Sequence, residues 1–250
     1  MADVLDDRSL GEIQGIDVDV GLDTAMSVLD VIQHLPGLSR VRDLSKALAM
    51  LDAVMSPRWE MRYYSFDSRW APDEEMASMR DGSGDDYSIV FRATGAFVRG
   101  FDHESPMSPY RVDPMQLWPG MLDGLPRELQ HLAAEPAFSD PEGTLLATAC
   151  FWRLKSDSQW ACGNVALPPD GGDDPDGSTF LFDLLFDDRP EAYQRFAEEY
   201  YEVKVNLEAV RHIYALHALT PDVLAPLNPD VSVADLEEDR QAIGYPAPAN

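Results

Sequence analysis

Four short segments of alternating side-chain character, joined by tight turns, constrain the fold of this chain more than any other feature of its sequence. They occupy residues 59–66, 75–80, 87–91 and 96–101. The connections DGSGDD at 81–86 and ATG at 93–95 are rich in the residues that tight turns between antiparallel strands require. Alternation with a period of two places one set of side chains on each face of a sheet. The pattern therefore predicts an antiparallel meander.

Helical patterns lie on both sides of the meander. Residues 39–55 place apolar side chains three and four positions apart until Pro57, which is typical of an amphipathic helix. Upstream, Asp23 is the expected cap of a shorter helix that ends near Pro36. Downstream, helices are expected at residues 126–135, 190–200, 207–217 and 232–243. The apolar run 180–186 fits either a buried strand or the start of a helix.

These elements predict a fold of the α+β class: an antiparallel sheet with flanking helices, a helical N-terminal extension and a helical C-terminus. Residues 1–35 are expected to form an acidic arm and a short helix, and residues 36–250 a single domain. With 45% hydrophobic residues, the chain can build a core for a domain of that size.

A further hairpin is expected around Ser156, where two apolar runs flank the sequence KSD. Folding these runs symmetrically about Ser156 sets Trp152 opposite Trp160 and Cys150 opposite Cys162, with all four side chains on one face. The two cysteines are therefore expected to be neighbours. In a reducing cytosol, two buried thiols are expected rather than a disulfide.

The chain carries 45 acidic and 19 basic residues, a formal net charge of −26. A field of that sign repels nucleic-acid phosphates and anionic lipid surfaces, so neither is expected as a direct partner. No apolar run reaches the roughly 20 residues that span a bilayer. The N-terminus lacks the basic and apolar regions of a secretory signal. We therefore expect a cytoplasmic protein, and the charge favours a basic protein partner.

Negative charge gathers in residues 170–202, which contain eleven acidic and two basic residues. Such a run is either a solvated face or the place where a partner with a basic site binds. The aromatic band at residues 59–70, interleaved with arginines, is either sheet core or an exposed stacking platform. The residues expected to bind a partner are Asp173, Asp174, Asp176, Asp187, Asp188, Trp59 and Trp70.

The turn at 81–86 has the residue types of a cation site. Asp81, Asp85 and Asp86 offer carboxylate oxygens, which divalent cations such as Ca²⁺ and Mg²⁺ prefer. The loop does not match the twelve-residue calcium loop, because Arg92 stands where that loop has its bidentate Glu. A hairpin turn alone also explains the sequence.

Asp102, His103 and Glu104 form the densest cluster of catalytic residue types in the chain. Adjacent residues on a strand point to opposite faces, so these side chains cannot all converge as a catalytic triad does. An ion-paired structural histidine is the alternative interpretation. No GxSxG, HExxH, Walker-type or GxGxxG motif occurs. The sequence therefore leans against an enzyme and predicts no cofactor.

Several phrases of the sequence are specific enough to suggest relatives. They are WEMRYYSFDSRW (59–70), EEMASMRDGSGDDYSIVF (74–91), GFDHESPMSPY (100–110), PEAYQRFAEEYYEV (190–203) and IGYP (243–246). In these phrases the chain resembles a widespread set of uncharacterised bacterial proteins, from about residue 45 to its end. Its acidic, aromatic-rich character is also similar, by analogy, to the immunity proteins of bacterial toxin systems. The resemblance implies a bacterial cytoplasmic protein.

The leading hypothesis is a binding protein that neutralises a basic protein or toxin partner with its acidic region. The alternative is a metal-assisted hydrolase that uses the loops 81–86 and 102–104. A structural or scaffolding role is the third possibility.

Overall fold

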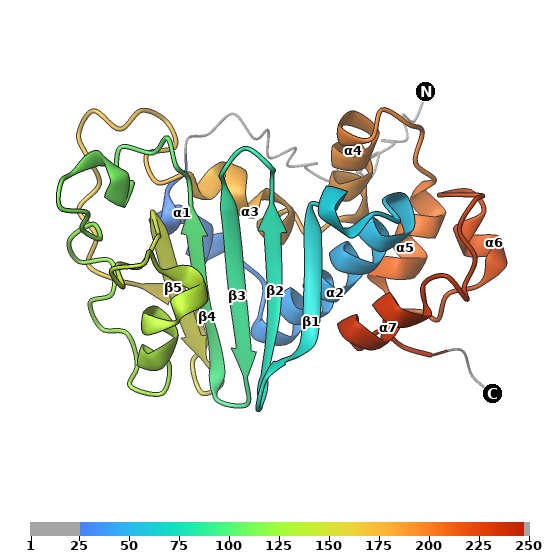
Figure 1. Ribbon diagram of the computed structural model, residues 1–250, viewed down its shortest axis with the longest axis horizontal. Coiled ribbons are helices and arrows are strands. Elements are labelled where there is room, and N and C mark those ends of the chain that lie inside the picture. Colours follow the sequence, from blue (N-terminus) through green and yellow to red (C-terminus); the bar gives the residue numbers. More distant parts are fainter. Residues whose placement is uncertain (1–25, 248–250) are drawn as a thin grey trace, which may run out of the picture.

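The computed structural model describes residues 26–247 and is built on one antiparallel sheet (Figure 1). Its strands pair in the order in which they occur along the chain. Within the described residues they are β1 (Tyr64–Ala71), β2 (Glu74–Arg80), β3 (Asp86–Arg92), β4 (Gly95–Phe101), β5 (Ala149–Leu154) and β6 (Ala161–Cys162). The first four strands form the predicted meander, so this prediction is confirmed.

Helices flank the sheet, as expected for an α+β fold. They are α1 (Val28–His34), α2 (Leu38–Met55), α3 (Ser178–Phe186), α4 (Pro190–Tyr200), α5 (Leu207–Tyr214), α6 (Pro221–Leu224) and α7 (Glu237–Ile243). Short 3-10 turns are η1 (Trp59–Met61), η2 (Pro109–Arg111), η3 (Gln130–Ala134) and η4 (Pro136–Phe138). The run 180–186 belongs to a helix. None of the helices between residues 26 and 247 is both long and apolar enough to cross a membrane.

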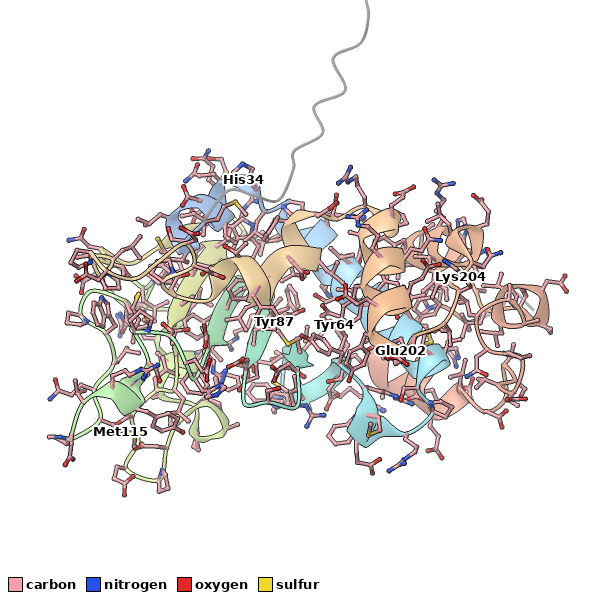
Figure 2. The ribbon with its side chains drawn as sticks, turned by 90° about the horizontal axis from the view of Figure 1, so that it is seen from above. His34, Tyr64, Tyr87, Met115, Glu202 and Lys204 are labelled. Carbon is pink, nitrogen blue, oxygen red and sulfur yellow. The ribbon has the colours of Figure 1, made fainter. Side chains whose placement is uncertain are left out.

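One face of the sheet is covered by helices, and the main hydrophobic core lies between them. The rings of Tyr87 and Phe151 lie 5.5 and 4.9 Å from that of Phe182 on α3. Figure 2 shows Tyr64 and Tyr87 between the strands and the helices. Helix α1 buries Val28 and Val31 in the same core, so it is part of the domain that the sequence placed after residue 35. The residues before Met26, including Asp23 and the acidic arm, lie outside the described part of the chain.

The opposite face is covered mainly over β3, β4 and β5, with Trp70 of β1 and Met76 of β2 packed against the edge of this cover. There a second hydrophobic cluster joins Val90, Phe97 and Trp152 to the irregular segment 105–148, which contributes Phe138. In Figure 1 this segment (green to yellow) lies in front of β4 and β5, while no ribbon crosses in front of β1 and β2. The same sheet therefore has one face sealed by helices and one that is partly open.

The start of β1 differs from the sequence prediction of a strand from residue 59. Residues 59–61 form η1, and the strand begins only at Tyr64. The carboxylate of Asp52, at the end of α2, accepts hydrogen bonds of 2.8 Å from the backbone N–H groups of Tyr63 and Tyr64. These bonds tie the chain to α2, so η1 forms the bend that brings it from the helix to the sheet.

Two predicted helix positions are also wrong. Residues 126–135 form turns and η3 instead of an α-helix, and Pro136 disfavours helical backbone at Glu135, where the stretch ends. The last helix begins at Glu237 instead of residue 232. Ser232 and Asp235 do form the reciprocal hydrogen bonds of the expected capping box, but the chain turns once more before the helix starts.

The β5–β6 hairpin is shifted by one residue from the predicted register. Phe151 pairs with Cys162, and Trp152 pairs with Ala161. The indole N–H of Trp160 donates to the Pro36 carbonyl at 2.7 Å, which holds this ring on the helix-covered side. Because of this slip of one residue, the side chains that were expected to pair lie on opposite faces of the sheet. Cys150 therefore lies in the second cluster and Cys162 packs against the main core, both as free thiols, and the predicted neighbourhood of the cysteines is wrong.

Candidate functional site

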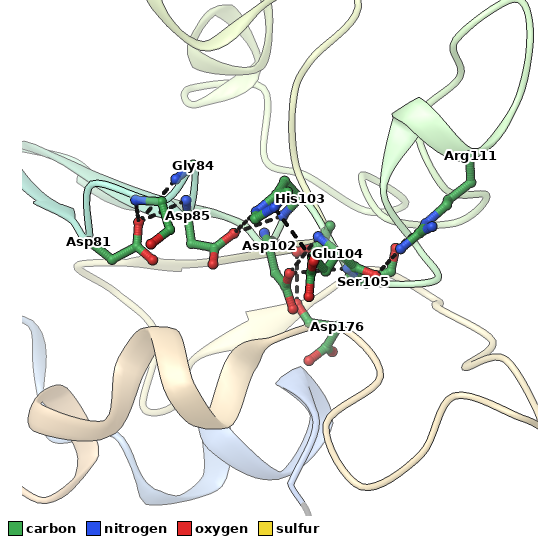
Figure 3. A network of polar contacts seen from close by, with 11 residues as sticks. Asp81, Gly84, Asp85, Asp102, His103, Glu104, Ser105, Arg111 and Asp176 are labelled. Atoms are coloured by element: carbon green, nitrogen blue, oxygen red, sulfur yellow. Dashed lines mark hydrogen bonds and ion pairs between the residues drawn. The ribbon is translucent and has the colours of Figure 1, made fainter.

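The end of the sheet near the β2–β3 turn brings together part of the predicted catalytic and metal-binding set (Figure 3). Asp85 Oδ1 accepts hydrogen bonds from the backbone N–H of His103 at 2.9 Å and lies 2.7 Å from His103 Nδ1. One carboxylate oxygen of Asp102 lies within 4.8 Å of these side-chain ligand atoms. The hydrogen bond to Asp85 raises the pKa of His103. An acid and a base from two different turns are therefore in direct contact.

The carboxylates of this network also hold its turns. Asp81 Oδ1 accepts backbone hydrogen bonds from Ser83 at 2.7 Å and from Asp85 at 3.0 Å. Asp102 Oδ1 accepts them from Glu104 at 2.8 Å and from Ser105 at 3.1 Å. Such bonds are those of ordinary Asx turns. Asp81 is therefore occupied in closing its own hairpin.

Two other predicted residues stand apart from the contact between Asp85 and His103. The Glu104 carboxylate is exposed and lies 4.0 Å from His103 Nε2. Asp86 begins β3 and forms an ion pair with Arg99 on the neighbouring strand. The two candidate loops thus meet through Asp85, Asp102 and His103, and Asp86 belongs to a different site.

The acidic region 170–202 is used in part inside the protein. Asp176 is fully buried and accepts backbone hydrogen bonds from Val28 at 2.8 Å and Ser178 at 3.0 Å. Burial raises its pKa to about 6. Asp174 accepts backbone hydrogen bonds of 3.1 Å from Thr179 and Phe180 in the first turn of α3. Asp176 is therefore removed from the predicted binding surface, because it joins α1 to α3 in the interior.

The remaining acidic residues of the predicted surface differ in their surroundings. Asp187 forms ion pairs with Arg189 at 2.7 Å and Arg195 at 3.2 Å. Asp188 forms one of 2.7 Å with Arg40 of α2. Asp187 and Asp188 are therefore compensated by arginines, whereas Asp173 is exposed to solvent.

The aromatic band at residues 59–70 separates into buried and exposed rings. Tyr63, Tyr64 and Phe66 are buried, which agrees with the sheet-core interpretation. Trp70 stacks on Phe138 of η4 with a centroid distance of 5.8 Å. Trp59 is 53% exposed. Only part of the band is thus available to a partner.

Exposed apolar side chains gather where η1 meets the end of α4. Trp59 and Met61 are each 53% exposed, Tyr200 is 41% exposed and Val203 46%. The buried ring of Tyr63 links the two elements, because its centroid lies 5.2 Å from that of Tyr200. We call Trp59, Met61, Tyr200 and Val203 the end patch. Of these, only Trp59 was singled out from the sequence.

A groove of about 490 Å³ lies on the partly open face of the sheet, and the sequence analysis missed it. We call it the open-face groove. Ser65, Ser78, Ser88 and Arg99 form one cross-strand row of its floor, in register from β1 to β4. The residues that also line it include Trp59, Asp67, Met76, Arg80, Asp86 and Phe138.

Arg99 is the buried charge of the open-face groove, with only 4% of its surface exposed. Its Nη1 donates to Asp86, whereas its Nε has no hydrogen-bond partner among residues 26–247. Its guanidinium carbon lies 5.9 and 5.7 Å from the ring centroids of Phe101 and Phe138. Burial lowers the pKa of Arg99 and raises that of Asp86, since both charges lose solvent. The sequence held one signal of this groove. Side chains alternate along each strand, so the serines lie on one face of the sheet and apolar side chains on the other.

No protein-family description, no curated protein and no solved structure matches this chain.

Proposed function

We propose that this protein is an acidic binding protein of the bacterial cytoplasm that captures a basic protein partner, such as a toxin domain, through the end patch. The observation that carries this proposal is the apolar end patch in a molecule with a net charge of −26. Several exposed apolar side chains in one region of a protein surface are typical of interaction sites.

Acidic side chains surround the end patch. Burial raises the pKa of Tyr63 and Tyr200, and the charge of Asp81 adds a smaller rise to both. Glu60 of η1 and Glu199 near the end of α4 are exposed. An apolar centre within an acidic rim suits a partner with basic residues around an apolar contact.

The end patch replaces region 170–202, which composition alone had indicated, as the centre of the proposed binding surface. The carboxylates of region 170–202 include a buried residue, Asp176, and several that form ion pairs with arginines. Charges that are already paired contribute less to the field that a partner meets. The end patch combines charge with aromatic and aliphatic area, which supplies most of the binding energy in typical interfaces.

The test is affinity capture from the native cell with three forms of the chain. Met61→Ser combined with Tyr200→Ser should lose a basic partner that the unchanged protein retains. The control Tyr110→Ser removes a side chain that is also exposed, at 55%, but lies on η2. The affinity for the recovered partner should fall as salt rises, because screening weakens long-range attraction. Recovery of no basic partner, or binding that ignores salt, would contradict the proposal.

Metal-assisted hydrolysis is the second candidate, favoured by the proximity of Asp85, Asp102 and His103. These are residue types that bind divalent cations and activate water. Metal analysis of protein purified without chelator tests this candidate. A bound ion that is lost in both Asp102→Asn and His103→Ala variants would support it, and a metal-free preparation would exclude it.

A further inference from the structure

We propose that the open-face groove binds a small ligand through its carboxylate group, which Arg99 and Arg80 receive. This inference does not rest on the protein partner proposed above, although Trp59 belongs to the end patch and also lines the groove. It rests on hydrogen-bond donors of Arg99 that no described residue matches, on two arginines that share one carboxylate, and on small polar side chains that keep the floor open.

The first observation is the incomplete bonding of Arg99. A guanidinium has five N–H donors, and buried polar groups are normally satisfied. Arg62, which is also buried, shows the usual arrangement: Nε donates to the Ser56 carbonyl at 2.9 Å, and both terminal nitrogens donate to Asp239. In Arg99 the only hydrogen bond to another described residue is that from Nη1 to Asp86. Nε is closed to solvent, so the donors of Nη2 are the ones that a ligand in the groove would use.

The second observation is the charge balance around Asp86. Arg80 lies directly opposite Asp86 in the β2–β3 pairing, and Arg99 forms an ion pair with Asp86 from β4. The Arg80 guanidinium lies 4.4 Å from the Trp59 ring, and it forms no ion pair with any carboxylate that the structure describes. Two arginines thus share one carboxylate. The lining as a whole, which also has Asp67, carries two arginines and two carboxylates, so the groove is neutral in a protein whose net charge is −26.

The third observation is the size of the floor residues. In the sheet register, the row Val90, Phe97 and Trp152 is apolar and covered. The adjacent row has Ser65 and Ser78, whose hydroxyl oxygens lie 2.7 Å apart, beside Ser88. Serines neither fill the groove nor form a core. Their hydroxyl groups can donate to the oxygens of a bound acid.

These features define the ligand class. Paired arginines recognise the planar fork of a carboxylate or the oxygens of a phosphate. The strongly acidic protein and the nearby carboxylates of Asp86 and Asp67 disfavour a dianion, so a singly charged carboxylate is the better fit. Trp59 and Phe138 provide apolar walls for the body of the ligand. An aromatic carboxylate therefore represents the class.

The experiment titrates the full chain with benzoate, followed by calorimetry and by backbone amide chemical shifts. Benzamide serves as the uncharged analogue, and phenyl phosphate as the doubly charged one. Benzoate should bind with a dissociation constant on the order of 1 mM, as suits a fragment of its size. The shifts should occur in Ser78, Ser88 and Arg99. Failure of benzoate to bind, equal binding of benzamide, or tighter binding of phenyl phosphate would overturn the assignment.

Variants separate the groove from its surroundings. Arg80→Gln alters an exposed side chain and should weaken benzoate binding about tenfold, as expected for the loss of a charge-assisted hydrogen bond. Arg69→Gln removes the same charge from β1 outside the groove and should leave affinity unchanged. Arg99→Gln should abolish binding, and its circular dichroism shows whether it remains folded. Equal effects of Arg80→Gln and Arg69→Gln would contradict the proposal.

A further control separates this inference from the proposed function. Tyr200→Ser lies in the end patch and does not line the groove, so it should retain benzoate binding. Loss of the protein partner with benzoate binding intact would therefore support two separate sites.

Discussion

The two faces of the sheet differ most clearly at adjacent residues of β3. Ile89 is fully buried in the main core beneath the helices, whereas Ser88 faces the open-face groove. The helix-covered face obtains its stability from apolar contact, so its side chains are fixed by packing. The other face is covered mainly over β3 to β5, and its more open part retains serines and arginines. Residues that do not build the core are thus available for binding.

The buried charges of the two faces also differ, in how completely they are hydrogen-bonded. On the helix-covered side, Asp52 is fully buried but accepts hydrogen bonds from Tyr63, Tyr64 and the Tyr193 hydroxyl, the last at 2.9 Å. On the other side, Arg99 is nearly as buried and has an unpaired Nε. Burial raises the pKa of Asp52 to about 6, and its hydrogen bonds offset part of the cost of burying the charge. A buried charge with unmatched donors is a candidate for recognition.

The largest expected effect comes from removing the satisfied charge. Asp52→Ala leaves two backbone N–H groups and the Tyr193 hydroxyl without their acceptor, and it should lower the free energy of unfolding by about 3–5 kcal/mol. Denaturant unfolding at pH 7 measures the loss. Asp52→Asn keeps an acceptor oxygen and should cost clearly less. If Ala and Asn were equally tolerated, the bonding of Asp52 would not explain how η1 and β1 are held.

The second prediction uses adjacent residues of β3. Ile89→Ala should destabilise the protein by about 2–5 kcal/mol, because it opens a cavity in the main core. Ser88→Ala should change stability by less than about 1 kcal/mol, since its hydroxyl faces the groove. Both are measured by chemical denaturation. Similar losses in the two variants would remove the contrast between the faces.

Local patterns predicted most of this architecture. The meander follows from alternation and turn residues, and α2 follows from the spacing of its apolar side chains before Pro57. The β5–β6 register does not follow from a local pattern, because the hydrogen bond from Trp160 to Pro36 joins residues that are distant in sequence. The same holds for η1, which depends on Asp52 accepting from Tyr63 and Tyr64.

The candidate sites show where sequence reasoning ends. The contact between Asp85 and His103 joins two loops that the sequence singled out separately. Acidic composition predicted a binding surface, but it does not tell buried Asp176 from exposed Asp173. Arg99 was missed because a single arginine in a strand carries no motif. The strand register pairs Arg99 with Ser88, and only this pairing shows that Arg99 belongs to the row of serines on the floor of the groove.

A smaller effect concerns Asp183, which lies on the helix-covered side with a single backbone donor, Leu184. Burial raises its pKa to about 6, so the folded protein holds this proton more tightly than the unfolded chain does. The cost of its charge is therefore absent below about pH 4 and complete above about pH 6. Asp183→Asn should raise the free energy of unfolding by about 1–2 kcal/mol at pH 8 and leave it nearly unchanged at pH 4. A pH-independent effect would show that burial does not penalise this carboxylate.

The smallest expected effect is a difference in thiol reactivity between Cys150 and Cys162, which lie on opposite faces of the sheet. It is measured without changing the stability of the protein. Burial raises the pKa of Cys150 to about 12, and it also raises the pKa of half-buried Cys162. Because only thiolates react quickly, Cys162 should react slowly with a thiol reagent in the folded protein, and Cys150 only after unfolding. Cys162→Ser should abolish labelling of the folded state, as mass spectrometry would show. Their side chains point to opposite faces of the sheet, so mild oxidation should form no bond between them. A rapid intramolecular disulfide in the folded protein would mean that Cys150 and Cys162 share a face, and that the β5–β6 register is the symmetric one about Ser156.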